Sequence, residues 1–380
     1  MKVKNKMKAI GIVAEYNPFH AGHRFLIEEA KRVTGAEICV SVMSGNFVQR
    51  GEPAVFNKWV RAENAVRQGA DLVLELPCVY ACASSEYFAR GAVSVLEGLG
   101  GVSYLAFGSE SGNLQELEDC RDCLDLHQEE IADLIREFSR QGMSYPAARE
   151  NAVRKVNPSV NPDILTEPNN ILGLEYIAKV KNMKPVTIKR MGMGYHESAS
   201  QIRKDLMDSS DEYRKKREEM EKNFFDLIRT KVLSESCDEL EKIASAGEGL
   251  SNRMKNCVRR VSSKQEFAEE VKSKRYTLTR INRLLLQTVL GIKTDDIKNA
   301  SPYVRVLAFN KEGAAFLKQL KKRELIAIPV VDNINKAVSS DELLRKTIEK
   351  DVLASDIYNL ISGEDLYLNS DYVKKPVFVR

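Results

Sequence analysis

Five short apolar segments alternate with helical periods over the first half of this 380-residue chain. The segments are Ala9–Glu15, Ile38–Met43, Leu72–Leu76, Tyr104–Phe107 and Val186–Lys189. Continuous apolar strands separated by helices are typical of a parallel sheet that is covered on both faces. The pattern therefore predicts an α/β fold with a doubly wound, Rossmann-like parallel sheet, whose ligands bind at the carboxyl ends of its strands.

After about residue 200 the pattern changes to charged helical segments with two strand-like runs, Val304–Phe309 and Leu325–Val331. We expect a basic tail over residues 1–7, the α/β domain over 8–200, and a mostly helical domain with minor β over 201–380. No apolar run approaches the ~20 residues that cross a bilayer, and the basic N-terminus lacks the apolar stretch of a signal peptide. Seven dispersed cysteines do not suggest a disulfide scaffold. We expect a cytoplasmic protein.

The strongest chemical signal is the turn after the first predicted strand, which reads EYNPFHAGH over residues 15–23. Two of the four histidines, His20 and His23, stand three apart across Gly22. The start of a helix offers backbone N–H groups and a partial positive charge to a phosphate. Glycine allows a close approach, and imidazoles stabilise charge on a phosphate under attack. We therefore predict a nucleotide site, rather than one capping and one packed histidine. Neither a Walker A nor a G-x-G-x-x-G motif accompanies it.

Two further segments follow predicted strands. Met43–Ala54 contains Gln49, Arg50 and Glu52, which could hold a small carboxylate, a phosphate or RNA, and a surface turn is the alternative. Gly108 ends the strand at Tyr104–Phe107, where it either allows close approach of a base or ribose or simply makes a turn.

Two helix starts complete the set of candidates. Asn169 or Asn170 could cap a helix that begins near Pro168, which would leave the other amide for an adenine edge. Ser198 or Ser200, with Arg203 one turn later, either forms a second phosphate site or is a helix cap beside a surface arginine.

A basic stretch lies in the second half of the chain. Between Arg253 and Arg283 there are ten lysines and arginines against three glutamates, an excess of seven positive charges. Such an excess favours a polyanionic partner, and Tyr276 within it could stack on a base. A solvated helix face is the alternative. The residues that we expect to contact RNA are Arg259, Arg260, Lys272, Lys274, Arg275, Arg280 and Arg283.

These motifs together resemble a known family. The stretch Gly11–His23 is similar to the signature of the HxGH nucleotidyltransferase superfamily. Combined with VMSGNFVQRGEPA, DLVLELP, FGSE, PNNILGLEY and KRYTLTRINR, it resembles the bacterial tRNA(Met) cytidine acetate ligases from about residue 8 to residue 320. Two positions depart from the resemblance: Ala21 stands where those enzymes have asparagine, and Gln201 where the superfamily often has threonine.

The resemblance implies a two-step reaction. Acetate would attack the α-phosphate of ATP to give acetyl-adenylate and pyrophosphate, with Mg²⁺ on the pyrophosphate. The wobble cytidine of elongator methionine tRNA would then accept the acetyl group on its exocyclic amine, which gives N(4)-acetylcytidine. His20 and His23 would be catalytic, and residues 201–380 would bind the anticodon region of the tRNA. No metal ligand can be assigned.

The resemblance also implies the binding residues. The ATP site would comprise Val13, Ala14, Glu15, Tyr16, Asn17, Pro18, Phe19, His20, Ala21, Gly22, His23, Arg24, Phe25, Leu26, Gly108, Asn169, Asn170 and Arg190. A phosphate or acetate loop would include Ser44, Gln49, Arg50, Ser200 and Arg203.

Two other functions remain open at this point. One is an adenylyltransferase that acts on a small cofactor precursor, and the other is a non-catalytic RNA-binding protein. The basic stretch disfavours the first, since a small substrate does not require a polycationic surface.

Overall fold

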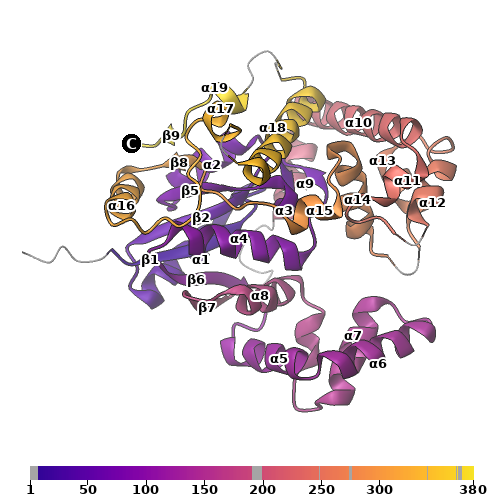
Figure 1. Ribbon diagram of the computed structural model, residues 1–380, viewed down its shortest axis with the longest axis horizontal. Coiled ribbons are helices and arrows are strands. Elements are labelled where there is room, and N and C mark those ends of the chain that lie inside the picture. The colour runs from indigo at the N-terminus through magenta and orange to yellow at the C-terminus, as the bar shows by residue number, and fades with distance from the viewer. Residues whose placement is uncertain are drawn as a thin grey trace, which may run out of the picture.

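The computed structural model describes residues 7–190, 199–247, 249–273, 276–339, 341–364, 366 and 370–380. Its centre is a seven-stranded sheet in the order β7-β6-β1-β2-β5-β8-β9 (Figure 1). The strands are β1 (Ala9–Ala14), β2 (Ile38–Ser44), β5 (Leu72–Leu76), β6 (Val102–Ser109), β7 (Lys184–Lys189), β8 (Val306–Phe309) and β9 (Val377–Phe378). A small separate hairpin is formed by β3 (Phe47–Val48) and β4 (Glu52–Pro53).

The α/β prediction is confirmed, but the sheet is not parallel throughout. Strands β7, β6, β1, β2 and β5 are mutually parallel, whereas β8 runs antiparallel to β5, and β9 pairs parallel with β8. The sheet thus extends across the boundary expected near residue 200. The predicted strand at Leu325–Val331 is wrong: an isolated bridge between Val304 and Val330 is the pairing observed there. A strand is fixed by a partner along its whole length, and this run is paired at one position only.

Helices cover both faces of the sheet. Those from the first half of the chain are α1 (Ala21–Thr34), α2 (Lys58–Arg67), α3 (Cys78–Ala81), α4 (Ser85–Leu99), α5 (Leu114–Leu126), α6 (Gln128–Arg140), α7 (Tyr145–Val156), the 3-10 helix η1 (Pro162–Leu165) and α8 (Pro168–Lys179). Side chains alternate along β1: Ile10 and Ile12 pack toward α1 and α2, while Ala9 joins the core under α4. Helices α5 to α7 form a separate group below the sheet in Figure 1.

The helices of the second half lie partly against the sheet and partly to its right in Figure 1. They are α9 (Ala199–Ser209), α10 (Asp211–Ser234), α11 (Cys237–Glu241), α12 (Leu250–Cys257), α13 (Lys264–Val271), α14 (Leu278–Leu290), α15 (Thr294–Lys298), α16 (Lys311–Lys322), α17 (Ile334–Ala337), α18 (Glu342–Ser362) and α19 (Ser370–Val373). Long helix α18 returns to pack on α10 and α3, so the chain's last part packs against elements from both halves of the chain. Among the described helices, none has the length and apolar character to span a membrane.

A buried network of charges fastens this returning segment to the sheet. The Nζ atom of Lys58 lies 2.6 Å from Glu75 Oε1 and 2.7 Å from Asp371 Oδ1. Arg305 contacts the same two carboxylates at 3.0 Å each. All four side chains are almost completely buried. Buried charges are tolerated when they are paired in this way, and breaking one pair is costly.

Candidate functional site

The topology brings the carboxyl ends of β1 and β6 together, which is where a sheet of this kind forms its ligand crevice. Strand β1 pairs with β2 on one side and with β6 on the other, so the strand order reverses at this point. Open α/β sheets bind ligands beyond the carboxyl ends of the strands at such a switch. The loop with both histidines follows β1, Gly108 lies in the last part of β6, and Arg190 follows β7. Three segments of the predicted ATP site therefore meet at one edge.

The two histidines form a matched pair at the start of α1. His20 is the N-cap, and its Nδ1 atom accepts a hydrogen bond from the backbone N–H of Gly22 at 3.1 Å. The backbone N–H of His20 donates in turn to Nδ1 of His23 at 3.2 Å. The two rings stack with their centroids 3.8 Å apart. Since both Nδ1 atoms act as acceptors, each neutral ring carries its proton on Nε2. The site thus presents two N–H donors beside the helix N-terminus.

The surroundings of His23 keep it neutral. Burial lowers the pKa of His23 well below its ordinary value, and His20 and Arg190 lower it further. The buried ring of Tyr16 meets His23 edge-on with centroids 5.0 Å apart, and its hydroxyl is hydrogen-bonded to Ser41 Oγ at 2.7 Å. Tyr16 therefore packs against the His23 ring and helps to hold it in place. A neutral imidazole can still donate from Nε2 to a phosphate oxygen.

Gly22 is required by the position of His20. A Cβ atom at residue 22 would lie 2.9 Å from Cε1 of the His20 ring. Ala21, by contrast, is exposed, and the capping contacts are made by His20, Gly22 and His23. The departure from the family pattern at Ala21 thus falls on a side chain that none of these histidine contacts uses.

The opposite wall is built by Glu110 and the start of α8. Asn169 Nδ2 donates to Glu110 Oε1 at 2.5 Å, and the backbone N–H of Asn170 donates to Glu110 Oε2 at 3.0 Å. The Asn170 side chain accepts from the Glu110 N–H at 2.9 Å and is buried. The predicted caps are wrong: Glu167 is the N-cap, because Pro168 occupies the first helical position, which suits proline. The side-chain oxygen of Asn170 holds this wall together, since it also accepts from the Ser111 N–H at 3.3 Å.

Arg190 lies across the end of β6. Its Nε atom is 3.9 Å from Glu110 Oε1, and its side chain is half exposed. A Cβ atom at Gly108 would come 3.3 Å from Arg190 Cγ. The glycine thus makes room for the Arg190 stem, which keeps the guanidinium at the crevice.

The β3–β4 hairpin is tied to the histidine loop by several polar contacts. The backbone N–H of Gln49 donates to Glu15 Oε1 at 2.9 Å, and that of Val55 donates to Asn17 Oδ1 at 2.8 Å. Burial raises the pKa of Glu15, although the Gln49 bond and nearby arginines, Arg50 first, oppose the shift. Gln49 and exposed Arg50 thus lie next to the loop that carries the histidines, as expected for a loop at the same edge.

Arg61 was not predicted, yet it organises the strand ends. It is 2% exposed, and its guanidinium donates to the carbonyls of Glu15 at 2.5 Å, Ser44 at 3.1 Å and Gly45. It thereby joins the loops after β1 and β2. The one local signal for this role is a charged residue on the otherwise buried face of α2.

The predicted second phosphate site also meets the histidine loop. Arg203 donates from Nη1 to the carbonyl of Asn17 at 2.7 Å and from Nη2 to Ser200 Oγ at 3.1 Å. Arg203 and Ser200 are therefore brought together beside the loop. Ser198 lies outside the described residues.

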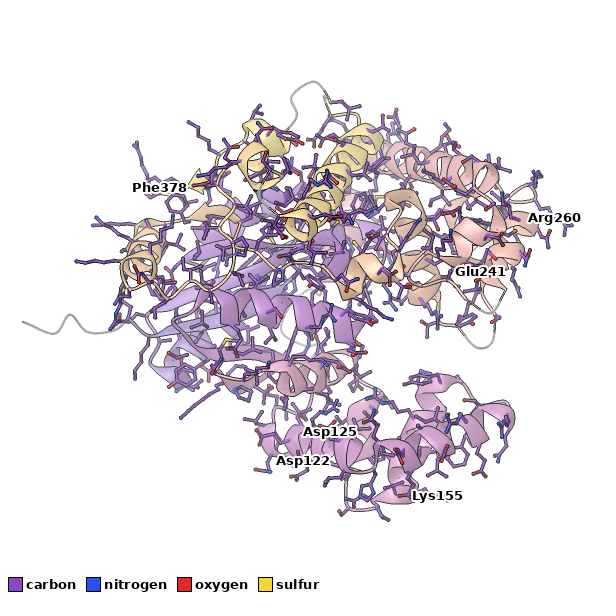
Figure 2. The ribbon with its side chains drawn as sticks, viewed as in Figure 1. Asp122, Asp125, Lys155, Glu241, Arg260 and Phe378 are labelled. Atoms are coloured by element: carbon purple, nitrogen blue, oxygen red, sulfur yellow. The ribbon has the colours of Figure 1, made fainter. Side chains whose placement is uncertain are left out.

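The basic stretch divides into two parts. Arg259, Arg260 and Lys272 are exposed, and Figure 2 labels Arg260 at the outer end of the helical region. Lys274 and Arg275 lie outside the described residues. The expectation that Tyr276 stacks on a base is wrong, since the ring is 7% exposed and packs against Arg280, whose guanidinium lies 4.4 Å from its centroid.

Arg283 differs from the outer basic residues. The hairpin presses on its backbone: a Cβ atom at Gly51 would lie 2.5 Å from Arg283 N. Its Nε atom is buried without a hydrogen-bond partner among the described residues. Burial, and then Arg280, lower the pKa of Arg283 to about 10. The backbone of this arginine therefore packs against the hairpin, and its side chain carries a charge that no described carboxylate pairs with.

Comparison with known proteins shows the family to which the chain belongs. The family model described as HIGH Nucleotidyl Transferase matches residues 7–370. The tRNA(Met) cytidine acetate ligase of Acetivibrio thermocellus is 36% identical over 93% of this chain and 94% of its own. That of Bacillus subtilis is 34% identical over 96% and 95%. The chain belongs to this ligase family within the HIGH nucleotidyltransferases.

Solved structures extend the likeness to three dimensions. Crystal structures of Thermotoga maritima TmcAL, one bound with alpha-thio ATP and one without ligand, superpose with TM-scores of 0.86 and 0.88. Each is 32% identical and covers 98% of this chain and 100% of the other. The suspected family and the α/β fold with a helical C-terminal part are thus confirmed. The individual residues assigned to ATP and tRNA stay predictions.

Proposed function

We propose that this chain is an ATP-dependent ligase that acetylates the wobble cytidine of elongator tRNA(Met) in the cytoplasm. Acetate attacks the α-phosphate of ATP, and the bond to pyrophosphate breaks to leave acetyl-adenylate. The exocyclic amine of the cytidine then attacks the acetyl carbon, AMP leaves, and the amine loses a proton. The product is N(4)-acetylcytidine. The curated names of the relatives and the nucleotide-bound neighbour support this assignment.

One observation carries the catalytic part of the proposal. His20 and His23 both accept through Nδ1 at the start of α1, so each neutral ring carries its N–H on Nε2, and the helix N-terminus adds partial positive charge beside them. The α-phosphate gains negative charge on its oxygens as acetate attacks and pyrophosphate leaves. Preorganised donors stabilise such charge without transferring a proton. Neutral histidines suit this role because the first step consumes no proton.

The binding of ATP would use the two walls of the crevice. Its triphosphate would lie along the histidine loop, with Arg203 and Ser200 near the phosphates. Its base and ribose would lie between Gly108, Arg190 and Asn169. The positions of the loops after β1 and β6 support this division.

Mg²⁺ would neutralise charge on the departing pyrophosphate. The described residues contain no cluster of three or more histidine, cysteine or acidic side chains that could hold a metal ion. This fits an ion that is held mainly by phosphate oxygens and water, as Mg²⁺ often is. We therefore assign no protein ligand to it.

The test is mass spectrometry of tRNA nucleosides after incubation with ATP, acetate and the protein. We expect acetate-dependent release of pyrophosphate and the appearance of N(4)-acetylcytidine. His20→Ala and His23→Ala should each lower the rate about 10²–10³-fold, the usual cost of one lost donor. His127→Ala is the matched control, since His127 lies between α5 and α6, away from the crevice.

Pyrophosphate release that depends on a cofactor precursor instead of acetate would indicate an adenylyltransferase. Unchanged acetylation by both site variants would refute the catalytic role.

A further inference from the structure

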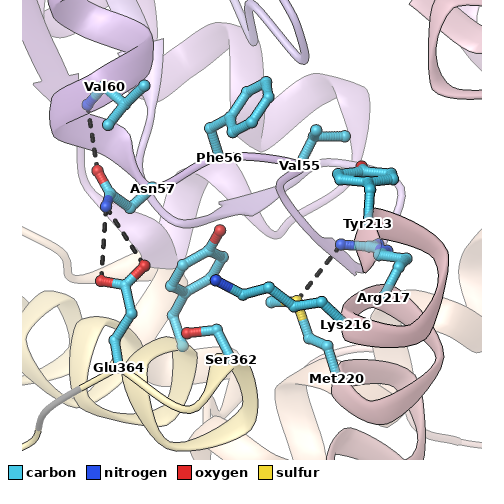
Figure 3. Close-up of a pocket in the computed structure, with 11 residues that line it drawn as sticks. Val55, Phe56, Asn57, Val60, Tyr213, Lys216, Arg217, Met220, Ser362 and Glu364 are labelled. Atoms are coloured by element: carbon cyan, nitrogen blue, oxygen red, sulfur yellow. Dashed lines mark hydrogen bonds between the residues drawn. The ribbon is translucent and has the colours of Figure 1, made fainter. Parts of the chain in front are cut away.

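A pocket lies beside the histidine loop, between the start of α2, one face of α10 and the end of α18 (Figure 3). Its volume is about 180 Å³. Residues from three distant parts of the sequence line it: Val55, Phe56, Asn57, Val60, Tyr213, Lys216, Arg217, Met220, Tyr358, Ser362 and Glu364. It is separate from the crevice at the ends of β1 and β6, and none of its lining residues was predicted to bind a ligand.

The pocket offers aromatic and apolar surface to a ligand. Phe56 is 39% exposed and Val60 is 49% exposed, although both are large apolar side chains. Buried Tyr358 and Met220 form part of the lining. Large apolar side chains that remain exposed around a concave site mark a binding surface more often than scattered ones do.

Cations from α10 form one wall. Arg217 is held in place, since it donates from Nη2 to the carbonyl of Pro53 at 3.1 Å and to Glu221 at 3.1 Å. Lys216 makes no hydrogen bond or ion pair with a described residue, and Figure 3 shows its side chain extending across the pocket. On the opposite rim Glu364 lies 3.5 Å from the amide of Asn57. The pocket thus combines a free ammonium group with aromatic surface.

The pocket is joined directly to the catalytic loop. Val55, which lines it, donates its backbone N–H to Asn17 in the loop between β1 and α1. Tyr358 donates its hydroxyl to the carbonyl of Ala54 at 3.1 Å. The pocket therefore lies on the hairpin side of the histidines, opposite the wall formed by Glu110 and α8. An acceptor substrate that approaches the histidines from this side would pass over it.

We propose that this pocket binds one unstacked nucleotide of the RNA substrate, a neighbour of the reacting cytidine. The base packs against Phe56, and Lys216 contacts the adjacent phosphate. Single-stranded nucleic acids are bound in this way, by aromatic stacking combined with cations along the backbone. This inference rests on the proposed function. An apolar segment of a protein would not use the free ammonium group of Lys216, which favours an anionic ligand.

Two variants test the pocket, each with a matched control. Phe56→Ala removes the stacking surface, and Lys216→Met removes the charge. Tyr145→Ala changes an exposed aromatic residue on α7, and Lys215→Met changes the neighbouring exposed lysine on α10. All four replace exposed side chains, and equal melting temperatures would verify that the fold is retained. The probe is an unmodified tRNA(Met) transcript.

We expect Phe56→Ala to weaken tRNA binding by about 5- to 150-fold, the range for loss of one base stack. Lys216→Met should lower the slope of log affinity against log salt by about 1, the loss of one phosphate contact. Both should leave acetate-dependent ATP–pyrophosphate exchange without tRNA unchanged, because the histidine site is intact. The two controls should match the wild type.

Two outcomes would overturn the inference. One is tRNA affinity and salt dependence equal to wild type in both pocket variants. The other is loss of pyrophosphate exchange in Phe56→Ala, which would place the residue in the activation step instead. Failure of the proposed function looks different, since the wild-type protein itself would then make no acetylcytidine. An active wild type with unaffected pocket variants refutes the pocket alone.

Discussion

Lys58 is the side chain whose loss the structure allows us to evaluate most directly. Its ammonium group is completely buried and lies within 2.7 Å of two carboxylates, those of Glu75 and Asp371. Arg305 contacts both carboxylates as well. In Lys58→Met, two buried negative charges would share one guanidinium. The change therefore removes charge compensation rather than a single surface contact.

Removal of one partner from a buried pair costs about 3–5 kcal/mol, so we expect Lys58→Met to lower the free energy of unfolding by that amount at pH 7. Burial opposes ionisation of Asp371, but Lys58 and Arg305 overcome it and lower the pKa of this carboxyl to about 2. Because this pKa is lower in the folded than in the unfolded chain, ionised Asp371 stabilises the fold at pH values above the unfolded pKa of ~3.9. This stabilisation is lost as the pH falls toward 2. Lys58→Met should weaken this dependence, because the pKa of Asp371 rises when Lys58 is removed.

The assay is urea unfolding followed by tryptophan fluorescence. Trp59 is the single tryptophan in the sequence, and the charged groups of Lys58 and Arg305 lie 5.7 and 5.6 Å from its ring. The signal therefore reports on the network itself. Lys222→Met is the control, since Lys222 makes an exposed pair with Asp226 and should cost less than about 1 kcal/mol. A loss below about 1 kcal/mol in Lys58→Met would refute the view that this network fastens the C-terminal segment.

Three further predictions concern the hairpin, the histidines and the basic surface. Gly51→Ala should destabilise the protein more than Gly35→Ala: both glycines have positive φ, but a Cβ at residue 51 would meet the backbone of α14, while residue 35 faces open space. Equal urea midpoints would contradict that packing. Because burial lowers the pKa of His23, the unfolded chain binds a proton below pH about 6.5 that folded His23 does not bind, so stability should decrease as the pH falls below about 6.5. His23→Gln should lack this decrease in pH-dependent unfolding. Arg259→Ala with Arg260→Ala should weaken tRNA binding and flatten its salt dependence but spare ATP binding, and unchanged affinity between about 50 and 200 mM salt would exclude this surface.

Local sequence was sufficient for the elements that make up the site. Strand β1, the turn after it and the N-terminus of α1 are adjacent in the chain, so a short stretch of residues determines them. The capping contacts at this helix start involve only His20, Gly22 and His23, because such contacts span two or three residues. The prediction that Asn169 or Asn170 caps α8 is wrong, although asparagine favours that position. Only the structure shows that Asn170 is bonded to Glu110.

Tertiary structure alone decided what closes the sheet and what surrounds the site. Strand β8 joins β5 from more than two hundred residues away, and no local pattern indicates its direction or partner. Arg61 and Lys58 lie on the apolar face of α2, but only the fold shows that both are buried and which groups they contact. The pocket beside the histidine loop combines α2, α10 and α18, which are far apart in the sequence. Hydrogen bonding within a turn depends on neighbours in the chain, whereas burial and charge pairing depend on which distant segments the folded chain brings together.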